Sequence, residues 1–257
     1  MTVAVQTRGA GRPLVCLHGI GSSADAFAPQ LAGLSDRYRV IAWDAPGYAR
    51  SADPDEELDL AGFAAAAASV IAGMEPPVHL LGVSWGGVIA ARVALEHPEL
   101  LRSLILIDSS PGSAGDPRAA ALMRARPAEL AELGGAEFAR RRAFRLLSAQ
   151  APAALVDQVA RTMASAIRLP GYRLAAESMA ATDLRPRLGE IDLPTLVLCG
   201  SEDQVTGTAA SIALWQGISQ ASYGVIRGAG HLANQERPDA VNSWIAGFLH
   251  TIDNADR

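Results

Sequence analysis

Short apolar runs separate segments of helical periodicity along most of the chain. Runs bounded by glycine, proline and polar residues indicate strands that are covered on both faces. They occupy residues 14–17, 38–43, 78–83, 101–107, 194–199 and 223–227. Apolar residues at helical spacing fall at residues 24–34, 58–73, 88–95 and 238–249. This alternation predicts an α/β fold with a mostly parallel, doubly covered sheet, to which residues 2–7 add an antiparallel strand.

The pattern changes between residues 111 and 188, where strand-like runs vanish and helical spacing dominates. We expect Pro127, Pro152, Pro170 and Pro186 to divide this segment into several short helices. We interpret residues 111–188 as a helical lid over the carboxyl edge of the sheet, and residues 1–110 and 189–257 as the core domain. Most lid arginines are expected on a solvated face, with one or two as candidates to hold a substrate carboxylate.

A Gly-Val-Ser-Trp-Gly sequence at residues 82–86 lies where a predicted strand gives way to a predicted helix. In that context Gly-x-Ser-x-Gly is typical of a nucleophile elbow. Ser84 would project from the turn, and the glycines would let strand and helix pack closely. The N–H of Trp85, at the helix start, would point to where negative charge develops. The alternative is a glycine-rich turn with no catalytic role. A histidine and a carboxylate that could act with Ser84 would favour the nucleophile elbow.

A serine nucleophile needs a histidine base, and the base needs an orienting carboxylate. His231 follows the strand predicted at 223–227 and is the candidate base. Asp203 follows the strand predicted at 194–199 and is the candidate acid, ahead of Asp108 and then Glu202. The remaining histidines are weaker candidates, expected to be structural or to lie in the tail: His18, His79, His97 and His250.

Composition restricts the partners and the location. A net charge of −5 argues against nucleic acid, because no basic excess would neutralise phosphates. No leader and no membrane-spanning run is evident, so we expect a cytoplasmic protein. Cys16 and Cys199 lie in apolar runs and are expected to be buried rather than paired. No metal-ligand cluster or phosphate loop is evident, so neither a metal nor another cofactor is expected.

Five short motifs together resemble the α/β-hydrolase fold superfamily, at residues 18–21, 44–51, 82–87, 200–203 and 228–231. The resemblance covers essentially the whole chain outside the lid. It implies that the N–H of Ile20 joins that of Trp85 in an oxyanion hole. Ala49 departs from the pattern, which usually has glycine there. Chain length, lid position and the turn at 18–23 are similar to 3-oxoadipate enol-lactonases and related small-ester and lactone hydrolases.

Some relatives are disfavoured by single residues. Haloalkane dehalogenases and many epoxide hydrolases have an aspartate nucleophile, whereas this chain has Ser84. Cofactor-free haloperoxidases usually have an aromatic residue where Ile20 stands.

We therefore expect a serine hydrolase that cleaves a small carboxylic ester or lactone through an acyl-enzyme. One alternative is a carbon–carbon bond hydrolase of the meta-cleavage type, acting on diketo acids, although those enzymes often carry Asn where Val83 stands. A thioesterase and a slow-turnover, receptor-like binding protein are further alternatives. Phe27 and Met123 are candidate pocket residues. The natural substrate and the oligomeric state are not indicated by the sequence.

Overall fold

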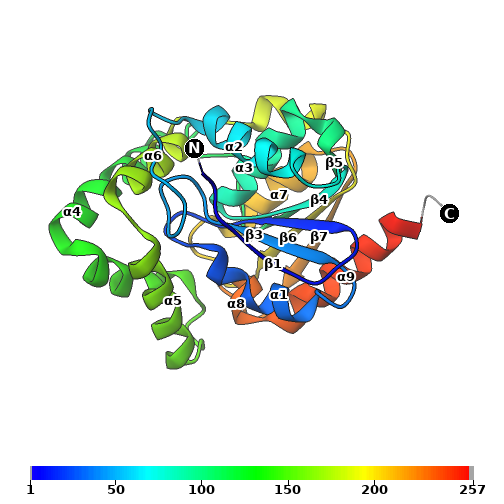
Figure 1. Cartoon of the computed structure of the whole chain (residues 1–257). Coiled ribbons are helices and arrows are strands. Elements are labelled where there is room, and N and C mark those ends of the chain that lie inside the picture. Colours follow the sequence, from blue (N-terminus) through cyan, green and yellow to red (C-terminus); the bar gives the residue numbers. More distant parts are fainter. Residues whose placement is uncertain (1, 255–257) are drawn as a thin grey trace.

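The computed structural model describes residues 2–254, which form a central seven-stranded sheet flanked by helices (Figure 1). The strands are β1 (Val5–Arg8), β2 (Pro13–Leu17), β3 (Arg39–Trp43), β4 (Val78–Val83), β5 (Leu101–Ile107), β6 (Thr195–Gly200) and β7 (Ala221–Ile226). Their order in the sheet is β1-β3-β2-β4-β5-β6-β7. β1 pairs antiparallel to β3, and the other neighbours are parallel. The expected mostly parallel α/β sheet is confirmed.

Helices cover both faces of this sheet (Figure 1). One face carries α2 (Leu60–Ala72), α3 (Trp85–Glu96) and α7 (Gly207–Gly217). The other carries η1 (Ala24–Phe27), α1 (Ala28–Gly33), α8 (Ala233–Glu236) and α9 (Pro238–Asn254). A short turn, η2 (Pro98–Leu100), precedes β5. Among residues 2–254 no helix has the length and apolar character needed to cross a bilayer.

The continuous apolar character of the strands follows from this double cover. Val15 and Leu17 of β2 belong to the core beneath α2 and α3, whereas Leu14 and Cys16 face the core beneath α1 and α9. Alternate residues of one strand point to opposite faces, so both sets must be apolar when both faces are covered.

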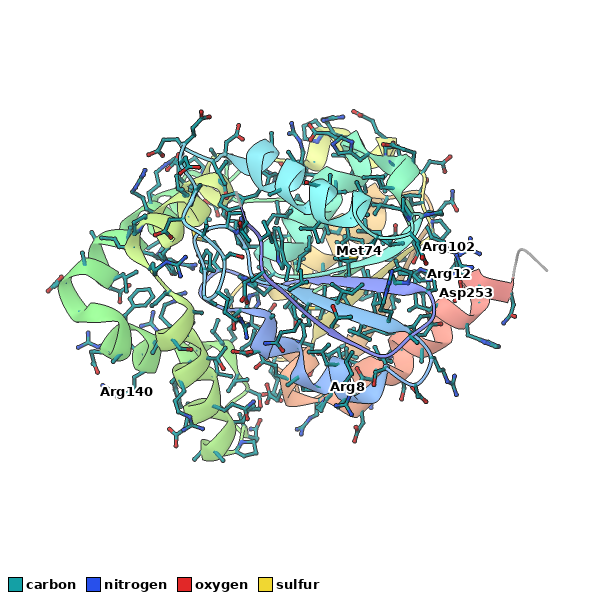
Figure 2. The ribbon with its side chains drawn as sticks, in the orientation of Figure 1. Arg8, Arg12, Met74, Arg102, Arg140 and Asp253 are labelled. Atoms are coloured by element: carbon teal, nitrogen blue, oxygen red, sulfur yellow. The ribbon has the colours of Figure 1, made fainter. Side chains whose placement is uncertain are left out.

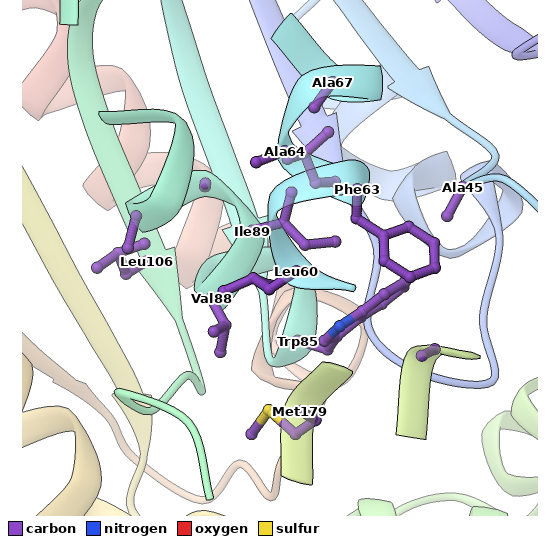
Figure 3. Packing of buried hydrophobic residues seen from close by; sticks show 14 of the residues in the cluster. Ala45, Leu60, Phe63, Ala64, Ala67, Trp85, Val88, Ile89, Leu106 and Met179 are labelled. Carbon is purple, nitrogen blue, oxygen red and sulfur yellow. The ribbon is translucent and has the colours of Figure 1, made fainter. Parts of the chain in front are cut away.

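The packing of α2 against α3 shows how the larger core is filled. Phe63 of α2 meets the ring of Trp85 edge-on, with ring centroids 4.8 Å apart (Figure 3). Leu60 and Ile89 lie in the same cluster, and Met179 reaches it from the insertion. The start of α3, which carries the elbow, is therefore fixed by core packing.

A separate charge cluster fixes the end of α9 to the sheet. Oδ1 of Asp253 forms ion pairs with Nε of Arg12 at 3.0 Å and with Nε of Arg102 at 3.2 Å (Figure 2). This cluster lies at the end of the strands opposite the insertion (Figure 2).

Between β5 and β6 the chain forms a helical insertion (Figure 1). It comprises α4 (Pro117–Leu146), α5 (Ala153–Ala166), α6 (Leu169–Ala180) and η3 (Arg185–Glu190). α4 packs against α5 and α6, and α6 also contacts α2. Arg168, before α6, donates to the carbonyl oxygens of Ala49 and Ser51, both at 2.7 Å, so this lid arginine fastens the insertion to a core loop. The division into separate domains at residues 110 and 188 stays a prediction.

One expectation for the insertion was wrong. Pro127 does not end a helix: it lies inside α4, and the helical backbone breaks at Gly134 (φ 71°, ψ 159°). Proline costs a helix one hydrogen bond and favours a bend, whereas glycine readily adopts the positive φ that interrupts the helix here. Pro152, Pro170 and Pro186 stand at helix starts, as expected.

Two glycines permit the close approach of β4, α3 and β2. A Cβ on Gly82 would lie 2.2 Å from the Gly86 carbonyl oxygen, and one on Gly86 would lie 2.1 Å from the Leu17 carbonyl oxygen. Both contacts are with backbone atoms, which cannot move without opening the sheet or shifting α3.

We predict that Gly86→Ala lowers the free energy of unfolding by more than about 3 kcal/mol, because the new methyl group overlaps the β2 backbone. Gly247→Ala in α9 is the matched control, since nothing lies within 4 Å of its Cβ position. That variant is expected to gain about 0.5 to 1 kcal/mol from helix propensity. Urea unfolding of both variants measures the difference, and equal stabilities would contradict the packing argument.

Candidate active site

Ser84 occupies a strained turn between β4 and α3. Its backbone has φ 54° and ψ −120°, a conformation that costs a non-glycine residue roughly 1 to 3 kcal/mol. The turn is held on both sides: the Ser84 N–H donates to the Ile107 carbonyl at 2.9 Å, and the Ser109 hydroxyl donates to the Ser84 carbonyl at 2.8 Å. The serine is therefore fixed at the carboxyl edge of the sheet by its neighbour β5.

A chain of hydrogen bonds leads from Ser84 to His231 and Asp203. The Ser84 Oγ lies 2.9 Å from Nε2 of His231, and Nδ1 of His231 lies 3.0 Å from Oδ2 of Asp203. His231 and Asp203 are both buried. The structure thus brings together three residues that are far apart in the sequence and follow β4, β6 and β7.

The carboxylate of Asp203 is held in its ionised form. Burial opposes ionisation, but the hydrogen bond and charge of His231 outweigh burial and lower the pKa of Asp203 to about 2. The N–H of Val205 at 2.8 Å and the hydroxyl of Thr206 at 2.7 Å also donate to this carboxylate. Asp203 is therefore an acceptor for His231 across the physiological pH range.

Asp108, the second candidate acid, does not contact His231. Its Oδ1 accepts from the Gly200 N–H at 2.7 Å and its Oδ2 from the Ala233 N–H at 2.9 Å. Burial raises the pKa of this carboxyl to about 7, against the opposing influence of His231. Asp108 thus joins the end of β6 to the start of α8, just beyond His231. Glu202, the third candidate, is half-buried and makes no side-chain hydrogen bond within residues 2–254.

The other histidines have structural surroundings. Burial lowers the pKa of His18 to about 4, so the ring is neutral. Its Nε2 accepts from the Ala45 N–H at 3.0 Å, which leaves Nδ1 to donate to the Gly19 carbonyl at 2.8 Å. His18 therefore fixes the turn before Ile20. His79 is buried in β4 beside Ser103, His97 follows the end of α3, and His250 is exposed in α9.

Ile20 and Trp85 line the same cavity as Ser84. Neither N–H donates to an acceptor within residues 2–254. The Trp85 amide is the first of α3, where the helix dipole favours a negative charge. The Trp85 ring points elsewhere: its Nε1 donates to the Ser178 hydroxyl of α6 at 2.9 Å.

A cavity of about 330 Å³ opens onto Ser84 and His231 between the sheet edge and the insertion. Phe27 and Met123, the two candidate pocket residues, both line it. The sequence did not identify Arg126 and Arg142 of α4, which also line it. No sequence signal separated these two arginines from the others in the insertion, because the kink at Gly134 disrupts the helical periodicity.

A buried cluster beside this site has the atom types of a metal centre. Side-chain oxygen and sulfur atoms of Asp108, Cys199 and Asp203 lie within 4.8 Å of one another. The oxygens already accept hydrogen bonds from amides, Thr206 and His231. Burial also raises the pKa of the Cys199 thiol to about 12, which disfavours the thiolate needed for ligation. The donor set fits a hydrogen-bonded support better than a metal site.

Known proteins match this chain over nearly its whole length. The model of the alpha/beta hydrolase fold family matches residues 12–238. An (E)-2-((N-methylformamido)methylene)succinate hydrolase from Acinetobacter baylyi is 28% identical, covering 95% of this chain and 92% of the relative. 3-Oxoadipate enol-lactonase 2 from the same organism is 27% identical, covering 93% and 90%.

Among solved structures, a malate-bound thermophilic esterase from Thermogutta terrifontis superposes with a TM-score of 0.88 at 26% identity, covering 97% of this chain and 93% of that one. The match of the family model spans most of the chain and includes all five motifs. The chain therefore belongs to the alpha/beta hydrolase fold family.

Proposed function

We propose that this protein hydrolyses a small carboxylic ester or lactone, with Ser84 as nucleophile, His231 as general base and Asp203 as the orienting acid. The hydrogen-bond chain from Ser84 Oγ through His231 to Asp203, opening onto a cavity, is the observation that carries the proposal. The names of the relatives, which include a hydrolase, an enol-lactonase and an esterase, support the same class of reaction.

The first half of the reaction follows from the direction of these hydrogen bonds. His231 donates from Nδ1 to Asp203, which leaves Nε2 free to accept the Ser84 proton. Ser84 Oγ then attacks the acyl carbonyl, and the negative charge of Asp203 stabilises the imidazolium. His231 returns the proton to the departing alkoxide, and Ser84 retains the acyl group as an ester.

The second half repeats these steps with water as nucleophile. His231 takes a proton from water, the hydroxide attacks the acyl ester, and the acid leaves as Ser84 recovers its proton. Each attack places a negative charge on the carbonyl oxygen. We assign the stabilisation of that charge to the N–H groups of Ile20 and Trp85, because both residues line the cavity and neither N–H has an acceptor within residues 2–254.

The cavity restricts the size of the substrate. A volume of about 330 Å³ lies at the lower end of the range for small-molecule pockets. A small ester or lactone fits this space, whereas a long lipid chain does not.

A second candidate function is hydrolysis of a carbon–carbon bond in a diketo acid. The lining of the cavity by Arg126 and Arg142 favours it, because such substrates are acidic. Val83, where those enzymes often have asparagine, argues against it. Turnover of a diketo acid without turnover of any ester would establish this second function.

We predict that Ser84→Ala lowers the turnover of esters by roughly 10⁴- to 10⁶-fold, because the acyl-enzyme can no longer form. A chain-length series of 4-nitrophenyl esters and a set of simple lactones provides the assay. Ser243→Ala is the matched control and should keep wild-type turnover, because this exposed serine of α9 donates to the Asp239 carbonyl and does not line the cavity. Near-native ester turnover by Ser84→Ala would overturn the proposal.

Asp203→Asn is predicted to lower kcat by roughly 10⁴-fold, because the amide cannot fix the His231 tautomer or stabilise its charge. Glu202→Gln, one residue away, is the matched control and should remain within about twofold. Comparable losses in both variants would contradict the assignment of the acid.

The pH dependence of the unfolding free energy of wild type and of Asp203→Asn tests the charge of Asp203. Its pKa of about 2 in the folded protein lies below the unfolded value of about 3.9, so ionisation stabilises the fold above pH 4. That contribution, about 2 kcal/mol, is lost as the pH falls from about 4 toward 2. The stability difference between wild type and Asp203→Asn should therefore shrink over this window. A constant difference would contradict the low pKa.

A further inference from the structure

Two arginines from opposite limbs of α4 reach the catalytic cavity. Arg126 precedes the kink at Gly134 and Arg142 follows it, yet both line the cavity that contains Ser84. Two positive charges that are sixteen positions apart in the sequence thus line the same small space.

The other arginines of the insertion are accounted for by ion pairs or by solvent. Arg124 pairs with Glu177, and Arg140 and Arg141 pair with Glu137. Figure 2 shows Arg140 on the outer side of α4, where its side chain is 71% exposed. Further pairs hold Arg168, Arg173, Arg185 and Arg187, while Arg118, Arg145 and Arg161 are exposed.

Arg126 and Arg142 differ from that set in both respects. They are half-buried, and among residues 2–254 no carboxylate forms an ion pair with either of them. Arg185 also lines the cavity, but its guanidinium is bound by the Asp183 carboxylate. Asp116, the acidic residue of the lining, caps the start of α4 through the N–H groups of Arg118 and Ala119.

The electrostatics of this pair are unfavourable in the free protein. Burial, and then the positive charge of Arg142, lower the pKa of Arg126 to about 10. Tyr172, and then the negative charge of Glu129, offset this lowering of the pKa only in part. Two like charges that are half removed from water repel one another, and an anion placed between them would relieve that repulsion.

Aromatic side chains lie beside both arginines. The Arg142 guanidinium lies over the Phe138 ring, 5.7 Å from its centroid, and Phe138 meets Tyr172 edge-on at 5.3 Å. Tyr172 in turn is near enough to Arg126 to influence its pKa. Arg142 is thus positioned by Phe138 before any ligand arrives, which lowers the entropy cost of binding.

We propose that Arg126 and Arg142 bind a carboxylate of the substrate, so that the enzyme acts on esters or lactones that carry a second, ionised carboxyl group. This inference rests on the proposed function. The carboxylate accepts charge-assisted hydrogen bonds from the planar guanidinium groups while the ester carbonyl lies at Ser84. Acidic substrates are held at both ends, whereas neutral esters of equal length are held at one.

Matched pairs of substrates test this specificity. The 4-nitrophenyl half-esters of succinate, glutarate and adipate have the same acyl chain lengths as 4-nitrophenyl butyrate, valerate and hexanoate. For at least one length, the wild type is expected to hydrolyse the half-ester with a kcat/KM about 10- to 100-fold higher than its neutral partner, the advantage that a buried charge-assisted contact gives.

Variants then assign the advantage to the two arginines. Arg126→Gln and Arg142→Gln should each reduce the ratio of kcat/KM between half-ester and neutral ester about 10-fold or more, mainly through KM. Arg145→Gln removes the same charge from an exposed position of α4 and is the matched control, with an unchanged ratio. Arg126→Lys should recover part of the lost ratio, because it restores charge without the planar fork.

The outcomes separate this inference from the proposed function. Ester hydrolysis that depends on Ser84 but shows no preference for any half-ester would overturn the carboxylate site alone. A preference that persists equally in the Arg126→Gln, Arg142→Gln and Arg145→Gln variants would also overturn it, and would indicate a general effect of charge. Absence of any Ser84-dependent ester turnover would overturn the proposed function itself.

Discussion

The geometry of the site depends on one close contact between backbones. There is no room for a Cβ at Gly82 or Gly86. Only glycine at these two positions allows β4, α3 and β2 to approach as closely as they do. Between these two glycines Ser84 has a strained, positive φ. Its hydroxyl oxygen lies 2.9 Å from Nε2 of His231. The strain is offset by β5 and by the core around Trp85.

Two buried carboxyl groups near His231 have different surroundings and different parts to play. Asp203 receives the imidazole N–H and stays ionised, whereas both oxygens of Asp108 are occupied by backbone amides. Asp108 ties β6 to the loop that presents His231, so it supports the position of the base without touching it. The charge next to the imidazole is thereby concentrated on one carboxylate, at the nitrogen that does not face Ser84.

The core of the fold could be predicted from the sequence because its signals are local. Each parallel strand of the sheet coincides with a short apolar run of the sequence, and Ser84, Asp203 and His231 each follow such a run. Parallel strands end at the same edge, so residues that follow them meet there without further information. The order of residues along the chain left both Asp203 and Asp108 open, because both lie between Ser84 and His231. In the structure Asp203 lies 3.0 Å from Nδ1 of His231. The helix at Gly207–Gly217 was not predicted, because its apolar residues lack a clear stripe.

The insertion was less predictable for a physical reason. The kink in α4 occurs at Gly134, where an added Cβ would meet nothing within 4 Å, so packing around this position gives no signal. Proline was a misleading signal, since Pro127 is accommodated within the helix. Which arginines face inward depends on that kink and cannot be read from periodicity. The sequence therefore predicts the candidate catalytic residues well. It predicts poorly which side chains of the insertion line the cavity.

Direct detection of the acyl-enzyme tests the central claim that Ser84 is the nucleophile. The protein would be mixed with a 4-nitrophenyl carbamate, because a carbamoyl group leaves serine more slowly than an acyl group. The mixture would then be quenched in acid, digested and analysed by mass spectrometry. The account predicts a carbamoyl group on the peptide that contains Ser84, formed together with a burst of 4-nitrophenol and absent from Ser84→Ala. Turnover without an adduct, or an adduct on another residue that persists in Ser84→Ala, would contradict it.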